Sequence, residues 1–396
     1  MSQRYTLTHR HLFLFGCAYY LFIPLVLATV GAFDSVDSLI LTARYFDAGS
    51  RWWSAYVAFA LLAPLMYLMG SGWTRLRQSE GSRPVEATPR VGARMLIPVY
   101  GLLLLVFTFQ ARALLFTGYS ETVDSSLQGQ LATLEMLLLY QYLYERGKQR
   151  TTATAFGLLL AINSLVLLSL GGRLYVMSAL VAIYFRWWNW GALAASAQIL
   201  SLLLVICVPV ALVGIGMWRV GEDDLGLIGF YVTAESLFTA ISGFTLFTGG
   251  HWSLLDMPTE FLAGFLNIVP AAVWPGKAEW LTSLTASMQN FDSPMGAVSI
   301  IASSVGNFGF MGALVFFGCV GAYMSFVART RGNAAREAHY CYLVGLLPFM
   351  FFRDPFQIQI KLVVTGLLLY WITRILRPNV AAEVALAPAA IQPISE

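Results

Sequence analysis

The chain has 396 residues and is strongly apolar, with 58% hydrophobic and only 11% charged residues. Soluble domains carry roughly a quarter charged residues, so this composition excludes a water-soluble globule and a disordered chain. The formal net charge of +3 gives no indication of a nucleic-acid partner. The four cysteines all fall inside apolar runs without metal-ligand spacing, which also excludes a secreted disulfide scaffold.

Long apolar runs indicate an all-α polytopic membrane protein, because a helix needs about 20 residues to cross a bilayer. We expect about ten spans in a single transmembrane domain over residues 1–377, followed by a disordered Ala/Pro-rich tail over 378–396. The first run is long enough to span and no clear cleavage site follows it, so it is interpreted as an uncleaved helix. The runs lie at 12–33, 52–69, 95–116, 127–144, 153–170, 174–188, 193–216, 308–327, 340–352 and 362–373.

The distribution of basic residues predicts the orientation, since cytoplasmic loops carry an excess of Lys and Arg. With both termini in the cytoplasm, about two thirds of the 24 Lys and Arg residues lie inside. The long segment 217–299 then lies outside, between the seventh and eighth spans. Its apolar parts, 225–247 and 261–274, are expected to form short helices on the outer membrane surface or dipping into it. Counting the first part as a further span would place more basic residues outside, so the charge rule argues against it.

Some basic residues on the outer side lie at positions that indicate a functional rather than a purely structural role. Arg353 and Lys361 lie in a hairpin between apolar runs of about 13 and 12 residues. Such runs span about 20 Å, against a hydrocarbon core of about 30 Å. We therefore expect Arg353, Asp354 and Lys361 to lie below the outer interface, where charges usually face a protein-lined cavity. The alternative is an Arg353–Asp354 ion pair that only shapes the turn.

Other outer cations lie at the ends of spans. Arg173 follows two glycines at the start of a helix, where backbone N–H groups and the helix dipole favour an anion. An ordinary hairpin with a snorkelling arginine is an equally common arrangement. Arg112 lies four residues before the end of the third span, Arg219 closes the seventh, and Lys277 lies in the long outer segment. Glu135, inside the fourth span, is expected to pair with Arg112, because buried charges are normally paired.

Several cations around a membrane-embedded cavity suit a lipid-linked phosphate or pyrophosphate. The candidates for binding it are Arg112, Arg173, Arg219, Lys277, Arg353 and Lys361. Breaking a sugar–pyrophosphate bond builds negative charge on the leaving group, which fixed cations stabilise in the transition state. The acceptor hydroxyl also requires a base, although a lone carboxylate or histidine in a loop is more often simply solvated. The catalytic candidates are Glu235, His251 and Asp354, with Asp256 and Glu260 also on this side.

In several motifs the sequence resembles the bacterial oligosaccharide repeat-unit polymerases, the Wzy-type O-antigen polymerases. Residues 269–277 read Val-Pro-Ala-Ala-Val-Trp-Pro-Gly-Lys, close to the stretch I-P-x-x-x-W-P-x-K that these proteins often show, with Val269 in place of Ile. Residues 307–312 match N-F-G-x-x-G at the entry of a span. The turn at 171–173 resembles their Gly-Ser-Arg turn, and the Arg-bearing hairpin at 352–354 also fits. The similarity covers roughly residues 158–361.

The resemblance implies an enzyme of the bacterial inner membrane with its active site facing the periplasm. A growing glycan would leave undecaprenyl pyrophosphate and join a sugar hydroxyl of the next lipid-linked repeat unit, without metal, nucleotide or other cofactor. Lipid-linked oligosaccharides are then the substrates, and a chain-length regulator and a flippase of the same pathway are candidate partners. Some members carry a Gly eleven residues after an Arg in two outer loops. Tyr184 and Phe230 stand at that distance from Arg173 and Arg219, so roles assigned through this pattern do not transfer.

Three other functions remain open. An O-antigen ligase would share the topology and the donor, but His251 lacks the Gly spacing of the ligase motif. A C-type glycosyltransferase would use an Asp in its first outer loop, for which Asp34 and Asp37 are a weak match. A polysaccharide transporter or flippase belongs to a different class, and it tends to show two similar halves that this sequence lacks. A transporter must also open inward, whereas a polymerase needs a cavity open only outward and to lipid.

Overall fold

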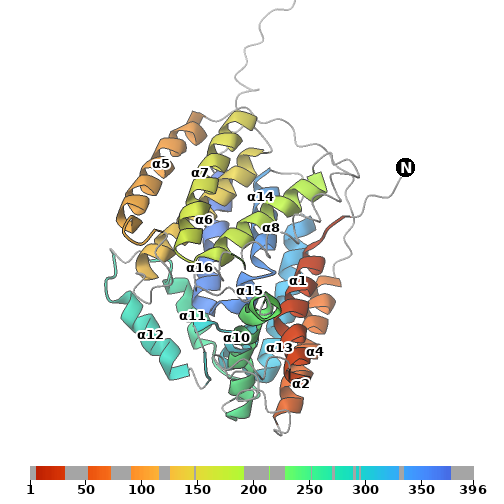
Figure 1. Ribbon diagram of the computed structural model, residues 1–396. Helices are drawn as coiled ribbons and strands as arrows, with labels where there is room; N and C mark the ends of the chain where they lie inside the picture. The colour runs from red at the N-terminus through yellow and green to blue at the C-terminus, as the bar shows by residue number, and fades with distance from the viewer. Residues whose placement is uncertain are drawn as a thin grey trace, which may run out of the picture.

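The computed structural model describes residues 6–31, 52–72, 91–115, 125–146, 149–190, 214, 228–250, 252–269, 273–288, 291–293, 296–329 and 334–375. These residues form helices and contain no β-strand, which confirms the all-α prediction. Figure 1 shows the helices gathered into one bundle, with α14, α15 and α16 near the middle of the view. In chain order the elements are α1 (His9–Cys17), the π-helix η1 (Ala18–Phe22), α2 (Ile23–Thr29), α4 (Trp53–Gly72), α5 (Val91–Ala111), α6 (Ser125–Arg146), α7 (Arg150–Ser169), α8 (Arg173–Trp190), α10 (Ile228–Thr248), α11 (Thr259–Leu266), α12 (Lys277–Met288), α13 (Ile300–Arg329), α14 (Ala334–Leu346), α15 (Met350–Arg353) and α16 (Phe356–Ile375).

Seven of the described helices are long and apolar enough to cross a membrane. Many of their Leu, Val, Phe and Met side chains are exposed, as contact with lipid requires. The chain is therefore a multi-pass membrane protein, while the count of ten spans and the orientation stay predictions. The predicted seventh span, 193–216, lies outside the described residues except for residue 214, and so does the tail 378–396. The seven helices run over His9–Thr29, Trp53–Gly72, Arg94–Ala111, Arg150–Ser169, Gly229–Thr248, Ile300–Arg329 and Phe356–Ile375.

The first apolar part of the expected outer segment differs from the prediction of a short surface helix. It forms a single helix of 21 residues, α10, and 67% of its most apolar stretch is buried, the highest share among the seven. α10 packs against η1, α2, α4 and α13. A helix that is apolar on all sides gains most when it is buried in a bundle, which explains the difference. The second apolar part does form a short helix, the eight-residue α11.

Small residues bring α4 and α13 into close contact. A Cβ atom on Gly70 would overlap the carbonyl of Gly318, and one on Gly321 would overlap the carbonyl of Tyr67. Close approach of backbones at small residues is the usual way in which helices pack in membranes, where no hydrophobic effect drives them together. These glycines therefore fix how deeply α13 lies in the bundle.

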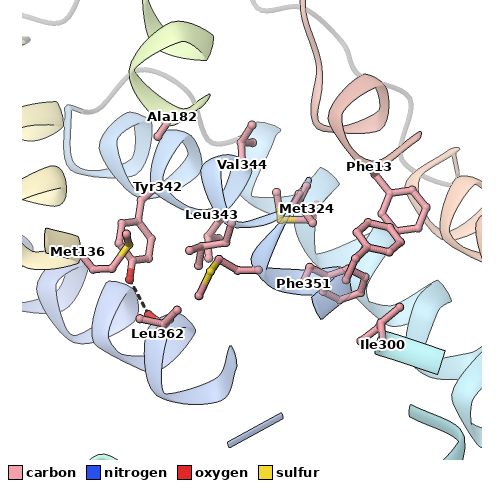
Figure 2. Close-up of a cluster of buried hydrophobic side chains, with 14 of the residues drawn as sticks. Phe13, Met136, Ala182, Ile300, Met324, Tyr342, Leu343, Val344, Phe351 and Leu362 are labelled. Atoms are coloured by element: carbon pink, nitrogen blue, oxygen red, sulfur yellow. Dashed lines mark hydrogen bonds between the residues drawn. The ribbon is translucent and has the colours of Figure 1, made fainter. Parts of the chain in front are cut away.

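The core around α14 is aromatic and fully enclosed. Every residue of α14 except Arg336 is buried. The hydroxyl of Tyr342 donates to the carbonyl of Leu362 at 2.9 Å and joins α14 to α16 (Figure 2). On the other side of the core, Phe351 of α15 approaches Phe13 of α1, with 6.0 Å between ring centroids (Figure 2). The short helix α15 is thus held deep in the bundle by its apolar residues.

Candidate functional site

Glu235 lies at the centre of a group of charged side chains from α8, α10 and the α15 turn. Its Oε2 accepts a hydrogen bond from Nη2 of Arg173 at 2.8 Å, and its Oε1 accepts one from Nε of Arg353. Nη1 of Arg353 also donates to Oδ1 of Asp354 at 3.1 Å. Side-chain exposure falls from 46% at Arg173 through 26% at Arg353 and 16% at Glu235 to 4% at Asp354. We call these four residues the Glu235 cluster.

Arg173 reaches this cluster because a tight turn separates α7 from α8. Gly171 has a φ of 88°, a conformation that glycine adopts without steric cost. The N–H of Gly172 donates to the carbonyl of Leu167 at 2.7 Å and closes the end of α7. α8 then begins at Arg173, as the sequence indicates, and its guanidinium meets a carboxylate rather than only lipid or water.

Backbone hydrogen bonds hold the turn that carries Arg353. The carbonyl of Arg353 accepts a hydrogen bond from the N–H of Val298 at 3.0 Å, and the N–H of Asp354 donates to the carbonyl of Met350 at 3.1 Å. The side-chain amide of Gln359 donates to the carbonyls of Phe351, at 3.1 Å, and of Asp354. The turn is therefore rigid, and the Arg353 guanidinium lies between two carboxylates.

The charges of the Glu235 cluster are balanced, with two guanidinium and two carboxyl groups. Burial raises the pKa of Asp354, although the neighbouring guanidinium of Arg353 opposes this shift. Burial alone would lower the pKa of Arg353, but Glu235 and Asp354 raise it above its ordinary value, so the guanidinium stays charged. An anion that binds Arg173 or Arg353 must therefore compete with Glu235.

Two tyrosines of the first span adjoin the cluster, and neither is among the residues predicted from the sequence. The hydroxyl of Tyr19 donates to the carbonyl of Val232 at 2.6 Å, one turn before Glu235 on α10. Tyr20 is 1% exposed, its hydroxyl has no hydrogen-bond partner, and it interacts electrostatically with Glu235 and Arg353. Both belong to the π-helix η1, an irregularity that is frequent at functional sites. The available signal was a Tyr-Tyr pair inside an apolar span, followed by a proline.

The remaining predicted residues fall into three groups. His251 and Arg219 lie outside the described residues, as do Asp34 and Asp37 of the C-type alternative. Arg112 is exposed, donates to the carbonyl of Phe109 at 3.0 Å and is not part of the cluster. Lys277 and Lys361 form a separate pair: they interact electrostatically with each other, whereas Arg353 interacts with Glu235, Asp354 and Tyr20.

The predicted pairing of Glu135 with Arg112 is wrong. Glu135 is fully buried and accepts hydrogen bonds from Nδ2 of Asn163 at 2.7 Å and from Oγ of Ser164 at 2.6 Å. Both donors come from α7, which packs against α6 along its length. Neutral donors on the adjoining helix satisfy this carboxyl without an arginine from another turn.

The N-F-G stretch has a structural role in this chain. Nδ2 of Asn307 donates to Glu260 at 3.0 Å, and its Oδ1 accepts from the N–H of Phe261 at 2.9 Å, so it ties α13 to the start of α11. Gly309 breaks α13 with a φ of 71°, and a Cβ there would lie 2.6 Å from the backbone of Leu255. Burial raises the pKa of Glu260, a shift that the hydrogen bond from Asn307 opposes.

Among the described residues, no group of three or more His, Cys, Asp and Glu side chains could hold a metal ion. Asp256 is exposed and accepts from the N–H of Met257 at 2.7 Å, as a solvated loop carboxylate does.

The chain matches no protein-family model, no curated protein and no solved structure. The Glu235 cluster and its surroundings are therefore the features that bear on function.

Proposed function

We propose that the protein polymerises lipid-linked oligosaccharide repeat units, as a glycosyltransferase of the bacterial inner membrane that uses a polyprenyl-pyrophosphate donor at the periplasmic face. The observation that carries this proposal is the carboxylate of Glu235, held between the guanidinium groups of Arg173 and Arg353 inside an apolar helix bundle. A carboxylate can accept the proton of a sugar hydroxyl, and arginines match phosphate oxygens. One cluster thus contains the two kinds of group that the transfer requires.

In the proposed step, the hydroxyl oxygen of the acceptor sugar forms a bond to the anomeric carbon of the donor glycan. The bond between that carbon and the pyrophosphate oxygen breaks, and the lipid pyrophosphate leaves with the electron pair. Glu235 takes the hydroxyl proton and becomes neutral. Neutral Glu235 binds Arg173 and Arg353 less strongly. Negative charge develops on the pyrophosphate at the same time, so the two guanidinium groups can bind and stabilise the leaving group in the transition state.

Asp354 takes a positioning role in this scheme rather than the role of a base. Its side chain is 4% exposed and bound to Arg353, so an acceptor hydroxyl has little access to it. It keeps one edge of the Arg353 guanidinium fixed while the Nε edge exchanges Glu235 for a phosphate oxygen. The predicted catalytic candidates are thus divided, with Glu235 as the base and Asp354 supporting Arg353.

Replacing Glu235 tests the proposal. In cells or membranes that supply lipid-linked repeat units, Glu235→Gln is expected to reduce chain extension by about 100-fold or more, as loss of a general base does. Arg112→Gln is the matched control, because this exposed arginine lies outside the cluster. The length distribution of the polysaccharide on a gel is the measurement. Normal-length polymer from Glu235→Gln, with the protein present in the membrane, would overturn the proposed site.

The product that accumulates in cells lacking the protein separates the polymerase from the ligase. A polymerase should leave lipid A core capped with a single repeat unit, whereas loss of a ligase should leave the core uncapped. A transporter would instead leave its substrate trapped on the cytoplasmic side of the membrane. The expected outcome is the single-unit cap, and either of the other two results contradicts the proposed function.

A further inference from the structure

Lys277 and Lys361, here called the lysine pair, form a second cationic group apart from the Glu235 cluster. Lys277 is the first residue of α12 and Lys361 lies in the second turn of α16. Each is partly buried, and the two interact electrostatically with each other. In the part of the chain that the structure describes, neither lysine belongs to an ion pair.

A chain of backbone contacts brings these lysines to the same place. Gly264 lets α11 pack tightly on α16, since a Cβ atom there would lie 2.8 Å from Cδ1 of Ile360. Nδ2 of Asn267 donates to the carbonyl of Gln357 at 3.2 Å. Nζ of Lys277 in turn donates to the carbonyls of Asn267 and Val269, at 3.1 and 2.7 Å. Lys361 follows Gln357 by four residues, so both lie on the same face of α16.

Among the described residues, no carboxylate pairs with either lysine, in contrast to the Glu235 cluster. Burial lowers the pKa of the Lys277 ammonium, because its charged form loses contact with water there. Two neighbouring cations in such a place cost free energy unless an anion offsets them. The lysine pair therefore suits a ligand with two negative charges, and a pyrophosphate diester carries that charge. Lysines bind phosphates as point charges, without the two-pronged geometry of arginine.

The surface beside the lysine pair is apolar and exposed. Val273 and Trp280 are exposed on either side of Lys277, and Trp280 lies 5.3 Å from Trp274 between ring centroids. Phe265 and Leu266, just before Asn267, are also exposed. Trp side chains favour the boundary between lipid and water, where phosphate groups lie. The ligand of this place is therefore expected to be a lipid, with its hydrocarbon along the apolar surface and its phosphates on the lysines.

We propose that the lysine pair binds the pyrophosphate of the acceptor, the lipid-linked repeat unit whose sugar hydroxyl is glycosylated. This inference rests on the proposed polymerase function, in which the Glu235 cluster acts on the donor. The acceptor keeps its pyrophosphate, so that anion has to be held without being activated as a leaving group. Arg353 ends α15 and Lys361 lies five residues beyond the start of α16 at Phe356, so their Cα atoms are at most about 20 Å apart and a short glycan can bridge the two places.

Binding of undecaprenyl pyrophosphate to the full-length protein in phosphatidylcholine nanodiscs tests the inference without any need for turnover. Lys361→Gln and the Lys277→Gln/Lys361→Gln double variant are expected to reduce the bound lipid from two molecules per protein to one, because the proposed donor site at the Glu235 cluster stays intact. Arg112→Gln is the control for loss of one positive charge. Unchanged binding by both lysine variants would overturn the site, and so would equal competition by cardiolipin, which would make it a general phospholipid site. The single variant spares the backbone clamp of Lys277 and so separates loss of binding from misfolding.

Steady-state kinetics separate this inference from the proposed function. The lysine variants should raise the KM for the acceptor about tenfold and leave the KM for the donor unchanged. If the wild-type protein polymerises and the lysine variants show normal acceptor KM, the acceptor site is wrong while the polymerase stands. If Glu235→Gln polymerises normally, the proposed reaction centre is wrong, and the acceptor assignment that rests on it falls too.

Discussion

Arg353 combines two interactions that no other cation could make at once. Its Nε donates to Glu235 while its Nη1 donates to Asp354 at 3.1 Å. A lysine keeps the charge but cannot bridge two carboxylates with a planar fork. Arg353→Lys is therefore expected to reduce polymer formation at least tenfold while the protein remains in the membrane. Polymer length on a gel and protein level by immunoblot are the two measurements.

Arg353→Ala is the harsher change, because it leaves the carboxyl of Asp354 buried without its guanidinium. Removing one partner of a buried ion pair costs about 3–5 kcal/mol, so this variant is expected to lose stability as well as activity. Adding Asp354→Asn relieves the unpaired charge and should restore the protein level but not the polymer. Normal polymer from this double variant would show that Arg353 serves only to shape its turn.

Tyr20 provides a second test at the residue scale. Its hydroxyl is buried without a hydrogen-bond partner, and an unsatisfied polar group costs about 1–3 kcal/mol. Tyr20→Phe should therefore leave the melting temperature unchanged or raise it. The same change should slow chain extension about tenfold. Once Arg353 binds the pyrophosphate instead of Glu235, the Tyr20 hydroxyl is a nearby neutral group that can donate a hydrogen bond to Glu235. A variant that melts earlier but extends glycans at the normal rate contradicts this role.

At the scale of elements, Glu260 is expected to make the docking of α11 depend on pH. Burial raises its pKa above the value of 4.5 that the unfolded chain has. A carboxyl with a raised pKa stabilises the fold while protonated, so its contribution is complete below pH 4.5 and is lost as the pH rises through the raised pKa. Glu260→Gln should remove this dependence and raise the melting temperature in detergent at pH 7. Glu279→Gln, at an exposed position of α12, is the matched control; equal effects of both changes would contradict the prediction.

The contact of α4 with α13 predicts a contrast between two glycines. An added methyl group at Gly321 would overlap the carbonyl of Tyr67, whereas one at Gly101 of α5 would meet open space. Gly321→Ala is therefore expected to lower the melting temperature. Gly101→Ala should leave it unchanged or raise it, since Ala stabilises a helix by about 0.5–1 kcal/mol relative to Gly. Similar melting temperatures for the two variants would show that the helices can separate without cost.

The apolar runs predicted most of the described helices, because length and composition alone decide whether a segment crosses lipid. The position of α10 could not be predicted in this way. Its apolar and small polar residues allow either a surface helix or a buried one, and only packing against η1 and α13 decides between them. The position of Arg353 below the outer interface, which the short runs around it predict, stays a prediction, whereas the Arg353–Asp354 ion pair given as the alternative does form.

The ion pair between Glu235 and Arg353 could not be predicted from the sequence, although both residues were candidates. They are 118 positions apart, and no local pattern relates them. The same holds for Glu135, whose predicted partner was chosen by sequence position and whose actual donors lie on the packed face of α7. Residue type and depth in the membrane indicate which charges need partners, but only the packing of helices determines which partners they take.

At the scale of the whole molecule, the Glu235 cluster bears on the topology. The α7–α8 turn carries Arg173 and the α14–α16 turn carries Arg353, and both bind one carboxylate. Two turns that bind one carboxylate must lie at a similar depth. The ten-span prediction is consistent with this, because it places both turns toward the outer side. That arrangement puts residue 82 in the cytoplasm and residue 293 outside. If α10 crossed the membrane completely, every loop after it would lie on the opposite side of the membrane.

Cysteine labelling can decide between these two topologies. With the native cysteines replaced, a single Cys at Ser82 should react with a membrane-impermeant maleimide only after the membrane is opened, whereas a Cys at Ser293 should react in intact spheroplasts. Ser293 is suited to the test because its side chain is not buried. Serine and cysteine have the same size apart from one atom, so the substitutions are expected to leave polymer formation intact, which serves as the control. Labelling of both from the same side would mean that α10 crosses completely, and the charge rule that predicts ten spans would then be wrong for this chain.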